Sequence, residues 1–269
     1  MSRGETWIRT LSTNVAESDY PSVLLGDADV GEQLPARLLA VVPDPKSTFP
    51  RARKGEVGLL EGIALARAIR KVMALDKDRP DNERRAIVSI VDVPSQAYGR
   101  LEEELGEHLY LAAAVDAYAS ARVLGHPVVT IVVGSAISGG FLAHGLQANQ
   151  ILALDDPGVE IHAMHKPAAA RITLRTVEEL DELAKTNAPL SYDVRDWATL
   201  GYCDELMKVE DPEHPTKMDV GQMERAIKEA IGRARTGPRD LSNRLQSPQA
   251  QHARSASLRA QQVLSEQWG

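Results

Sequence analysis

The chain has 269 residues, of which 43% are hydrophobic and 26% are charged, a composition typical of globular proteins and unlike that of disordered or fibrous chains. A net charge of −7 argues against nucleic acid as the main partner, and a single cysteine, Cys203, excludes an internal disulfide and a metal site built from several thiolates. No run reaches the ~20 apolar residues of a membrane span, and the N-terminus lacks a signal-peptide core, so we expect a cytoplasmic protein with no membrane partner.

Short apolar runs bounded by Pro, Gly or Asp predict buried strands. We expect strands at 23–25, 36–42, 86–91, 127–133, 151–154, 159–164 and 206–209. Apolar residues three and four positions apart predict helices at 56–75, 102–124, 139–149, 177–186, 194–200 and 220–235. The rest of residues 1–35 is expected to be irregular, and 134–138 is expected to be a loop of small residues.

Strands and helices alternate through most of the chain, which predicts βαβ units and a parallel α/β sheet. We place this domain at residues 1–235 and a C-terminal extension at 236–269, helical over 250–268. From residue 233 onward the chain has six Arg and two acidic residues, in contrast to its acidic whole. Two interpretations remain open, a solvated extension and an arm that docks on a partner subunit.

The most informative stretch follows the strand at 127–133, where small residues precede the pair Gly139 and Gly140 at the start of a helix. The first N–H groups of a helix lack internal partners and favour negative charge, and glycine lets a ligand approach the backbone. These two amides are therefore candidate donors to a developing oxyanion, with Ser138 and Ser135 shaping the loop. Alternatively, the glycines merely permit close packing and Ser138 caps the helix.

A second turn, Ser95 to Ala97, follows the strand at 86–91. Successive strands of a parallel sheet end at the same edge, where ligands usually bind. We therefore expect an N–H of the Ser95, Gln96 and Ala97 turn to face the N–H of Gly140 across one cavity. On this basis Gly140→Val is expected to leave the fold and partner binding largely intact and to lower the activity of this site at least tenfold.

The segment 87–145 resembles the carboxyltransferase branch of the crotonase superfamily. The shared motifs are a D-x-P-x-x-x-x-G turn, an acidic E-E-x-G helix start, a V/H-P strand and S-G-G before a helix, found here at Asp92 to Gly99, Glu103 to Gly106, Pro127 and Ser138 to Gly140. The length of the chain and the later run VEIHAMHKPAAARI are most similar to malonate decarboxylase gamma subunits. The resemblance covers about residues 20–235.

This resemblance implies an α/β crotonase-like fold of stacked βαβ units. It also implies an obligate beta subunit, an acyl-carrier subunit and an alpha (transferase) subunit as partners. Together with the beta subunit, the chain would convert malonyl thioester to acetyl thioester and CO2 through an enolate, whose oxygen the backbone amides stabilise. The thioester would be carried on a phosphopantetheine-type arm of the acyl-carrier subunit, with no metal and no cofactor bound directly.

Two rival functions remain. The first is a carboxyltransferase subunit of a biotin-dependent acyl-CoA carboxylase or decarboxylase, in which the glycine amides hold a biotin carbonyl. The second is a non-catalytic scaffold for the beta subunit, which the lack of an obvious acid–base residue favours. The proposed site comprises Gly139, Gly140 and Ser138 as catalytic residues, with the substrate bound by Ser135, Ala136, Ser95, Gln96, Ala97, His165 and Lys166.

Other polar residues have simpler interpretations. His162 and His165 lie three apart on an expected strand, where they would face opposite sides and share no metal. His144 is expected to be a packed, hydrogen-bonded histidine and Cys203 a small buried residue. For the basic loop containing Arg51, Arg53 and Lys54, solvation is favoured over contact with the phosphate of a carrier arm.

Overall fold

The computed structural model describes residues 1–30 and 35–268. Within these residues, eight strands form one sheet in the order β1-β2-β3-β4-β5-β6-β8, with β7 paired to β5. The strands are β1 (Asn14–Glu17), β2 (Val23–Asp29), β3 (Pro35–Val41), β4 (Ala86–Val93), β5 (Val128–Ile137), β6 (Gln150–Leu154), β7 (Ile161–His162) and β8 (Glu205–Met207). The α-helices are α1 (Arg3–Leu11), α2 (Leu59–Leu75), α3 (Arg100–Glu104), α4 (Glu107–Val123), α5 (Ser138–Ala143), α6 (Lys166–Ile172), α7 (Val177–Ala184), α8 (Val194–Thr199), α9 (Lys217–Thr236), α10 (Asn243–Gln246), α11 (Pro248–Ala253) and α12 (Ser255–Trp268).

The sheet combines an antiparallel edge with a parallel centre. β1, β2 and β3 pair antiparallel, whereas β3, β4, β5, β6 and β8 pair parallel. The two central strands β4 and β5 are rich in Val and Ile and almost wholly buried, as expected of parallel strands covered on both faces. The parallel α/β prediction is therefore confirmed.

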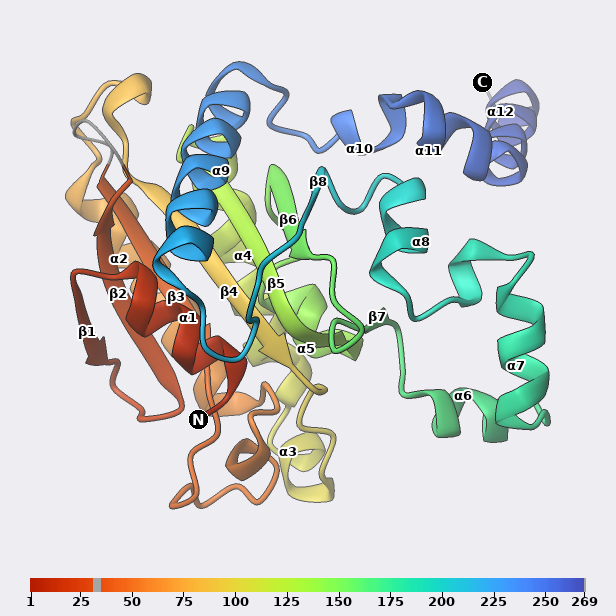
Figure 1. Ribbon diagram of the computed structural model, residues 1–269, viewed down its shortest axis with the longest axis horizontal. Coiled ribbons are helices and arrows are strands. Elements are labelled where there is room, and N and C mark those ends of the chain that lie inside the picture. The colour runs from red at the N-terminus through yellow and green to blue at the C-terminus, as the bar shows by residue number, and fades with distance from the viewer. Residues whose placement is uncertain (31–34, 269) are drawn as a thin grey trace.

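Helices cover both faces of the sheet (Figure 1). α1 and α9 lie on the face toward the viewer, and α2 and α4 pack against each other on the far face. The core between these layers contains the fully buried side chains of Trp7 and Tyr118 together with the aliphatic residues of β4 and β5. Helices α6 to α8 and α10 to α12 extend to one side of this body.

Several boundaries differ from the sequence predictions. Residues 3–11, expected to be irregular, form α1, whose buried face includes Trp7, Ile8 and Leu11. The expected helix at 102–124 is two helices, separated at Gly106, which adopts a left-handed φ of 81°. Part of the expected irregular entry, residues 31–34, lies outside the described residues, as does Gly269 of the extension.

The two most consequential differences lie after β5. The expected loop at 134–138 is strand as far as Ile137, because β7 pairs with Ala136 and Ile137. The expected helix at 139–149 ends at Ala143, and Gly145 then takes a φ of 138° that few other residues adopt. α5 is consequently a short segment of six residues directly after a long strand.

The C-terminal extension begins on the body and ends away from it. Arg244 donates to the backbone carbonyls of Leu146 and Ala148, and Arg239 pairs with Asp81. By contrast, α12 has no buried residue. In this part of the chain α11 covers residues 248–253 and α12 covers 255–268, and the division of the chain at residue 235 stays a prediction. None of the helices in the described part of the chain has the length and apolar character needed to cross a membrane.

Candidate active site at the carboxyl ends of β4 and β5

The Ser138–Gly140 turn is a sharp change from strand to helix. Ile137 still has extended backbone, whereas Ser138 adopts a left-handed φ of 64°, which is uncommon for a residue with a side chain. β4 ends beside this turn, since Val93 pairs with Ala136. The sequence prediction that the two strand ends open at one edge is therefore confirmed.

The side chain of Gln96 is hydrogen-bonded to the first backbone amide of this turn. Its Oε1 accepts hydrogen bonds from the N–H of Gly139 (N···O 3.0 Å) and from the hydroxyl of Ser138 (O···O 3.2 Å). The N–H of Gly140 has no acceptor among residues 1–30 and 35–268. The protein itself thus satisfies one of the two amides that the sequence suggested for an oxyanion, and leaves the other without an acceptor.

The Ser95–Ala97 turn is held by the segment before α2. The N–H of Val57 donates to the carbonyl of Ser95 at 3.0 Å, and the N–H of Ala97 donates to the carbonyl of Val57 at 2.8 Å. The Ala97 amide is therefore already paired. Ser95 is buried, and its hydroxyl has no hydrogen-bond partner within the described residues.

Gly140 is needed for packing as well as for its amide. A Cβ at this position would lie 2.6 Å from the backbone oxygen of Ser95 and 2.6 Å from Cγ1 of Val93. Real Cβ atoms do not approach other atoms so closely, and a backbone carbonyl cannot easily move away. The geometry therefore argues against the expectation that Gly140→Val leaves the fold largely intact, because the backbone of the two turns would have to move apart.

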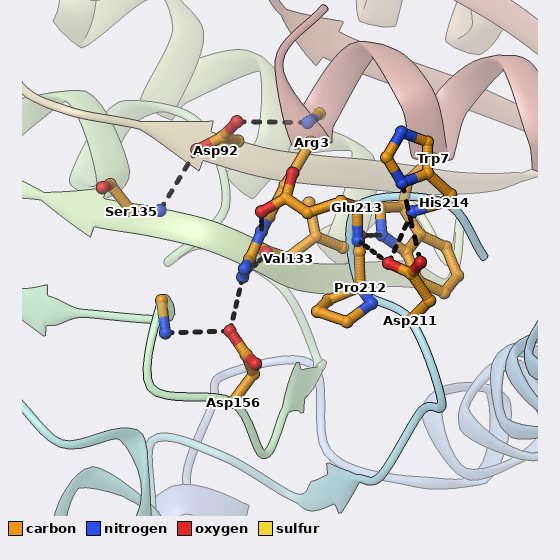
Figure 2. Close-up of polar contacts among 12 residues, drawn as sticks. Arg3, Trp7, Asp92, Val133, Ser135, Asp156, Asp211, Pro212, Glu213 and His214 are labelled. Carbon is orange, nitrogen blue, oxygen red and sulfur yellow. Dashed lines mark hydrogen bonds and ion pairs between the residues drawn. The ribbon is translucent and has the colours of Figure 1, made fainter.

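Ser135 and Ala136 belong to β5 rather than to a loop. The N–H of Ser135 donates to Oδ1 of Asp92 (3.2 Å), and the N–H of Ala136 donates to the carbonyl of Glu160 (2.8 Å). Figure 2 shows Asp92 between the backbone of Ser135 and the start of α1, where its Oδ2 accepts from the N–H of Gly4. The backbone amides of Ser135 and Ala136 are therefore both engaged in contacts within the protein.

Arg3 anchors the same part of α1 to the sheet. Its guanidinium donates to the carbonyl of Val133 and forms ion pairs with Asp156 (2.7 Å) and Glu213 (2.6 Å), as Figure 2 shows. These carboxylates raise the pKa of Arg3 despite its partial burial, which opposes that rise. The cluster connects the N-terminus to segments 130 and 210 residues away, and sequence spacing gives no signal of it.

His165 and Lys166 lie at the start of α6. Lys166 is engaged within the α6–α7 region, where its Nζ pairs with Asp181 at 2.8 Å and lies 5.1 Å from the ring centre of Tyr192. His165 lies close enough to Glu56 for the two side chains to interact electrostatically. His165 is thus brought toward the segment that holds the Ser95–Ala97 turn, whereas Lys166 bonds elsewhere. His162 stacks on the ring of Tyr192.

Side chains of the basic loop bind within the chain. Arg51 lies over the ring of Tyr98, 4.1 Å from its centre, and is 3.3 Å from the buried carboxylate of Glu56. Arg53 donates to the carbonyl of Ser47. Burial raises the pKa of Glu56, and the charge of Arg51 opposes that rise. Glu56 and Tyr98 therefore border the Gln96 turn, although the sequence pattern did not single them out.

His144 and Cys203 are buried as expected. His144, at the end of α5, bonds to Tyr118 and to the carbonyl of Ile90, and its complete burial lowers its pKa to about 4. Burial raises the pKa of Cys203 to about 12, which leaves an unreactive thiol.

A cavity of about 660 Å³ lies between α1 and the loop at 43–48, and neither the 95–97 turn nor the 138–140 turn lines it.

The parallel sheet, the helices on its two faces and the two turns at its carboxyl edge form a crotonase-like α/β fold. A solved transcarboxylase 12S structure shares this fold at 20% identity and a TM-score of 0.63, over 88% of this chain and 41% of the other. The family model for the malonate decarboxylase gamma subunit, MdcE, matches residues 52–268. The chain belongs to the malonate decarboxylase gamma subunit family.

Three further similarities are to proteins with named activities or assemblies. The malonyl-S-ACP:biotin-protein carboxyltransferase MADD of Malonomonas rubra is 35% identical over 219 residues, which are 81% of this chain and 75% of that protein. A chain in the crystal structure of a Pseudomonas malonate decarboxylase hetero-tetramer in complex with coenzyme A is 48% identical, with a TM-score of 0.92 and full coverage of both chains. A Pseudomonas MdcD-MdcE hetero-dimer structure gives 48% identity and a TM-score of 0.89 over the whole of both chains.

Proposed function

We propose that this chain pairs with a beta subunit related to MdcD and that the two together decarboxylate malonyl thioester to acetyl thioester and CO2. The observation that supports this most is the meeting of the Ser138–Gly140 and Ser95–Ala97 turns at the carboxyl edge of the sheet. The substrate is presented on the phosphopantetheine-type arm of an acyl-carrier subunit, and an alpha (transferase) subunit completes the complex.

The reaction needs a stabilised negative charge. The bond between C2 and the malonyl carboxylate breaks, CO2 leaves, and the electron pair passes to the thioester oxygen as an enolate. A proton then adds to C2. Donors that point at the thioester oxygen stabilise the charge as it develops, and removing one such donor typically slows an enzyme about 10²- to 10³-fold. The amide of Gly140, which lacks an acceptor, and the groups around Gly139 are the donors at this edge.

Reconstitution tests the proposal. Purified alpha, beta, gamma and acyl-carrier subunits are combined, and CO2 release from malonyl-carrier thioester is measured with each subunit left out in turn. We expect turnover to need both the beta and the gamma chain. Full activity of the beta subunit without this chain would contradict the proposal and would favour a scaffold, a role consistent with the paired amides of Gly139 and Ala97.

Carboxyl transfer to biotin is the second candidate, favoured by the similarity to a malonyl-S-ACP:biotin-protein carboxyltransferase. Avidin distinguishes the two reactions because it sequesters biotin. We expect CO2 release to be unchanged by avidin. Inhibition by avidin, together with transfer of labelled carboxyl to a biotin protein, would instead establish the transferase.

A further inference from the structure

We propose that the carboxamide of Gln96, rather than the amide of Gly139, donates the hydrogen bond to the thioester oxygen. This inference rests on the proposed function and assigns the substrate contact to one side chain. Three observations support it. The carboxamide oxygen of Gln96 faces the turn, its nitrogen is accessible, and hydrogen bonds fix the backbone around it.

The orientation of the carboxamide is fixed by its partners. A backbone N–H is a donor and never an acceptor, so the atom 3.0 Å from the Gly139 nitrogen is the Gln96 oxygen. The hydroxyl of Ser138 is a second donor to the same oxygen. The NH2 group therefore lies on the opposite side of the carboxamide, away from Gly139.

The NH2 group of Gln96 is accessible and unused. Nε2 has no hydrogen-bond acceptor among the described residues, yet it is absent from the fully buried side-chain atoms that lack a partner in this part of the chain. It is therefore in contact with solvent, and Gln96 as a whole is half-buried. Two N–H donors are thus available at the edge of the sheet where the turns meet.

The turn positions this donor. The backbone of Gln96 is flanked by the bonds between Val57 and residues 95 and 97, and its carbonyl accepts from the N–H of Tyr98. The side chain is fixed at its far end by Ser138 and Gly139. Because little motion remains, the donor needs little reorganisation when charge develops.

The two bonds to Oε1 also strengthen the donor. Hydrogen bonds in a chain polarise one another, so electron density drawn toward Oε1 makes the Nε2–H groups more positive. As the C2–carboxylate bond breaks and charge moves to the thioester oxygen, an Nε2–H of Gln96 stabilises that charge. The Gly139 amide acts through Gln96 and does not touch the substrate.

Three variants of the reconstituted complex separate this role from the alternatives. Gln96→Glu can still accept from Gly139 and Ser138, but it has no donor and adds negative charge. Gln96→Ala removes the side chain. Gly139→Ala displaces it, because a Cβ there would lie 2.2 Å from Oε1 of Gln96, the movable end of that side chain. Gln249→Glu, on an exposed residue of α11, is the matched charge control.

We expect Gln96→Glu to lower kcat for CO2 release at least 100-fold, Gln96→Ala and Gly139→Ala to lower it about 10- to 100-fold, and Gln249→Glu to leave it unchanged. Full activity of Gln96→Glu would show that Gln96 only holds the turn. Faster turnover in Gln96→Ala and Gly139→Ala would show that Gln96 blocks the Gly139 amide. Either result overturns the inference.

A second measurement does not depend on turnover. The infrared stretch of acetyl-pantetheine, labelled with 13C at its thioester carbonyl, is recorded on the wild-type complex and on the Gln96→Glu complex. We expect binding to lower the frequency in the wild type and to lower it less in the variant. An equal frequency in the two complexes overturns the inference, whereas an inactive wild-type complex that still shows the shift refutes only the proposed function.

Discussion

Polar side chains hold both ends of α5, but the two ends differ in exposure. The N-terminal end is partly exposed to solvent, and we call it the open end; the C-terminal end is fully buried, and we call it the closed end. At the N-terminal end, Gln96 bonds to Ser138 and Gly139, and all three residues are half-buried. At the C-terminal end, His144 and Tyr118 are fully buried. The helix between them has only six residues, so the closed end fixes the position of the open one.

The closed end is a complete chain of hydrogen bonds. Nε2 of His144 lies 3.2 Å from the carbonyl of Ile90, which can only accept, so the proton is on Nε2. Nδ1 then accepts from the hydroxyl of Tyr118 at 2.9 Å, and Tyr118 accepts from Ser89 at 2.9 Å. Each of the three donors has an acceptor. At the open end, by contrast, the NH2 of Gln96 has no protein acceptor among the described residues.

This difference separates stability from function. A buried network in which each group is paired makes one arrangement rigid, and breaking it leaves unpaired groups in the core. A half-exposed group with a spare donor adds little to stability and can bind a ligand. Changes at the two ends are therefore expected to have different consequences.

The largest effect is expected for Gly140→Val, at a buried position directly after the half-exposed residues of the open end. The new Cβ would press on the backbone oxygen of Ser95, 2.6 Å away, and the fold would have to open between α5 and the neighbouring turn. We expect a loss of about 3 kcal/mol in the free energy of unfolding, measured by urea denaturation. A variant as stable as the wild type would show that the two segments separate easily.

A large pH effect is expected from the closed end. Burial lowers the pKa of His144 from 6.5 to about 4. Between these two pH values the imidazole is therefore protonated in the unfolded chain and neutral in the folded chain. The associated stability is present above pH 6.5 and is lost as the pH falls toward 4, by about 3 kcal/mol. His144→Gln retains a donor and an acceptor without titrating. We expect its stability to decrease less than that of the wild type between pH 7 and pH 4, and parallel curves would contradict this.

A smaller effect of opposite sign is expected beside the open end. The carboxyl of Glu107 lies against the backbone of Ala97, and burial, with the charge of Glu103 adding to it, raises its pKa to about 7. Its Oε1 is buried and has no partner in the described part of the chain. An acid whose pKa is raised on folding destabilises the fold as the pH rises from 4.5 through 7.

Glu107→Gln tests this group. We expect the variant to be about 2 kcal/mol more stable than the wild type at pH 8 and equally stable at pH 4, measured by urea denaturation at both values. A gain of the same size at both values would show that the effect is one of packing and not of charge.

The sequence by itself determined the layered α/β architecture. The runs at 86–91 and 127–133 are short, β-branched and bounded by turn residues, so burial of their side chains favours a strand in almost any context. The same local information placed the turns at Ser95 and Ser138 on one edge, because parallel strands end together. The motifs of these two turns also indicated the family.

Only the tertiary structure decided what those turns do. β5 continues to Ile137 because β7, more than 20 residues later, supplies its partner, and α5 is short because the backbone turns at Gly145. The bond from Gly139 to Gln96 spans 43 residues. The spacing of residues in the chain predicts which face of a helix or strand they occupy. A hydrogen bond between distant residues also depends on how the segments pack against each other, and only the folded structure determines that packing.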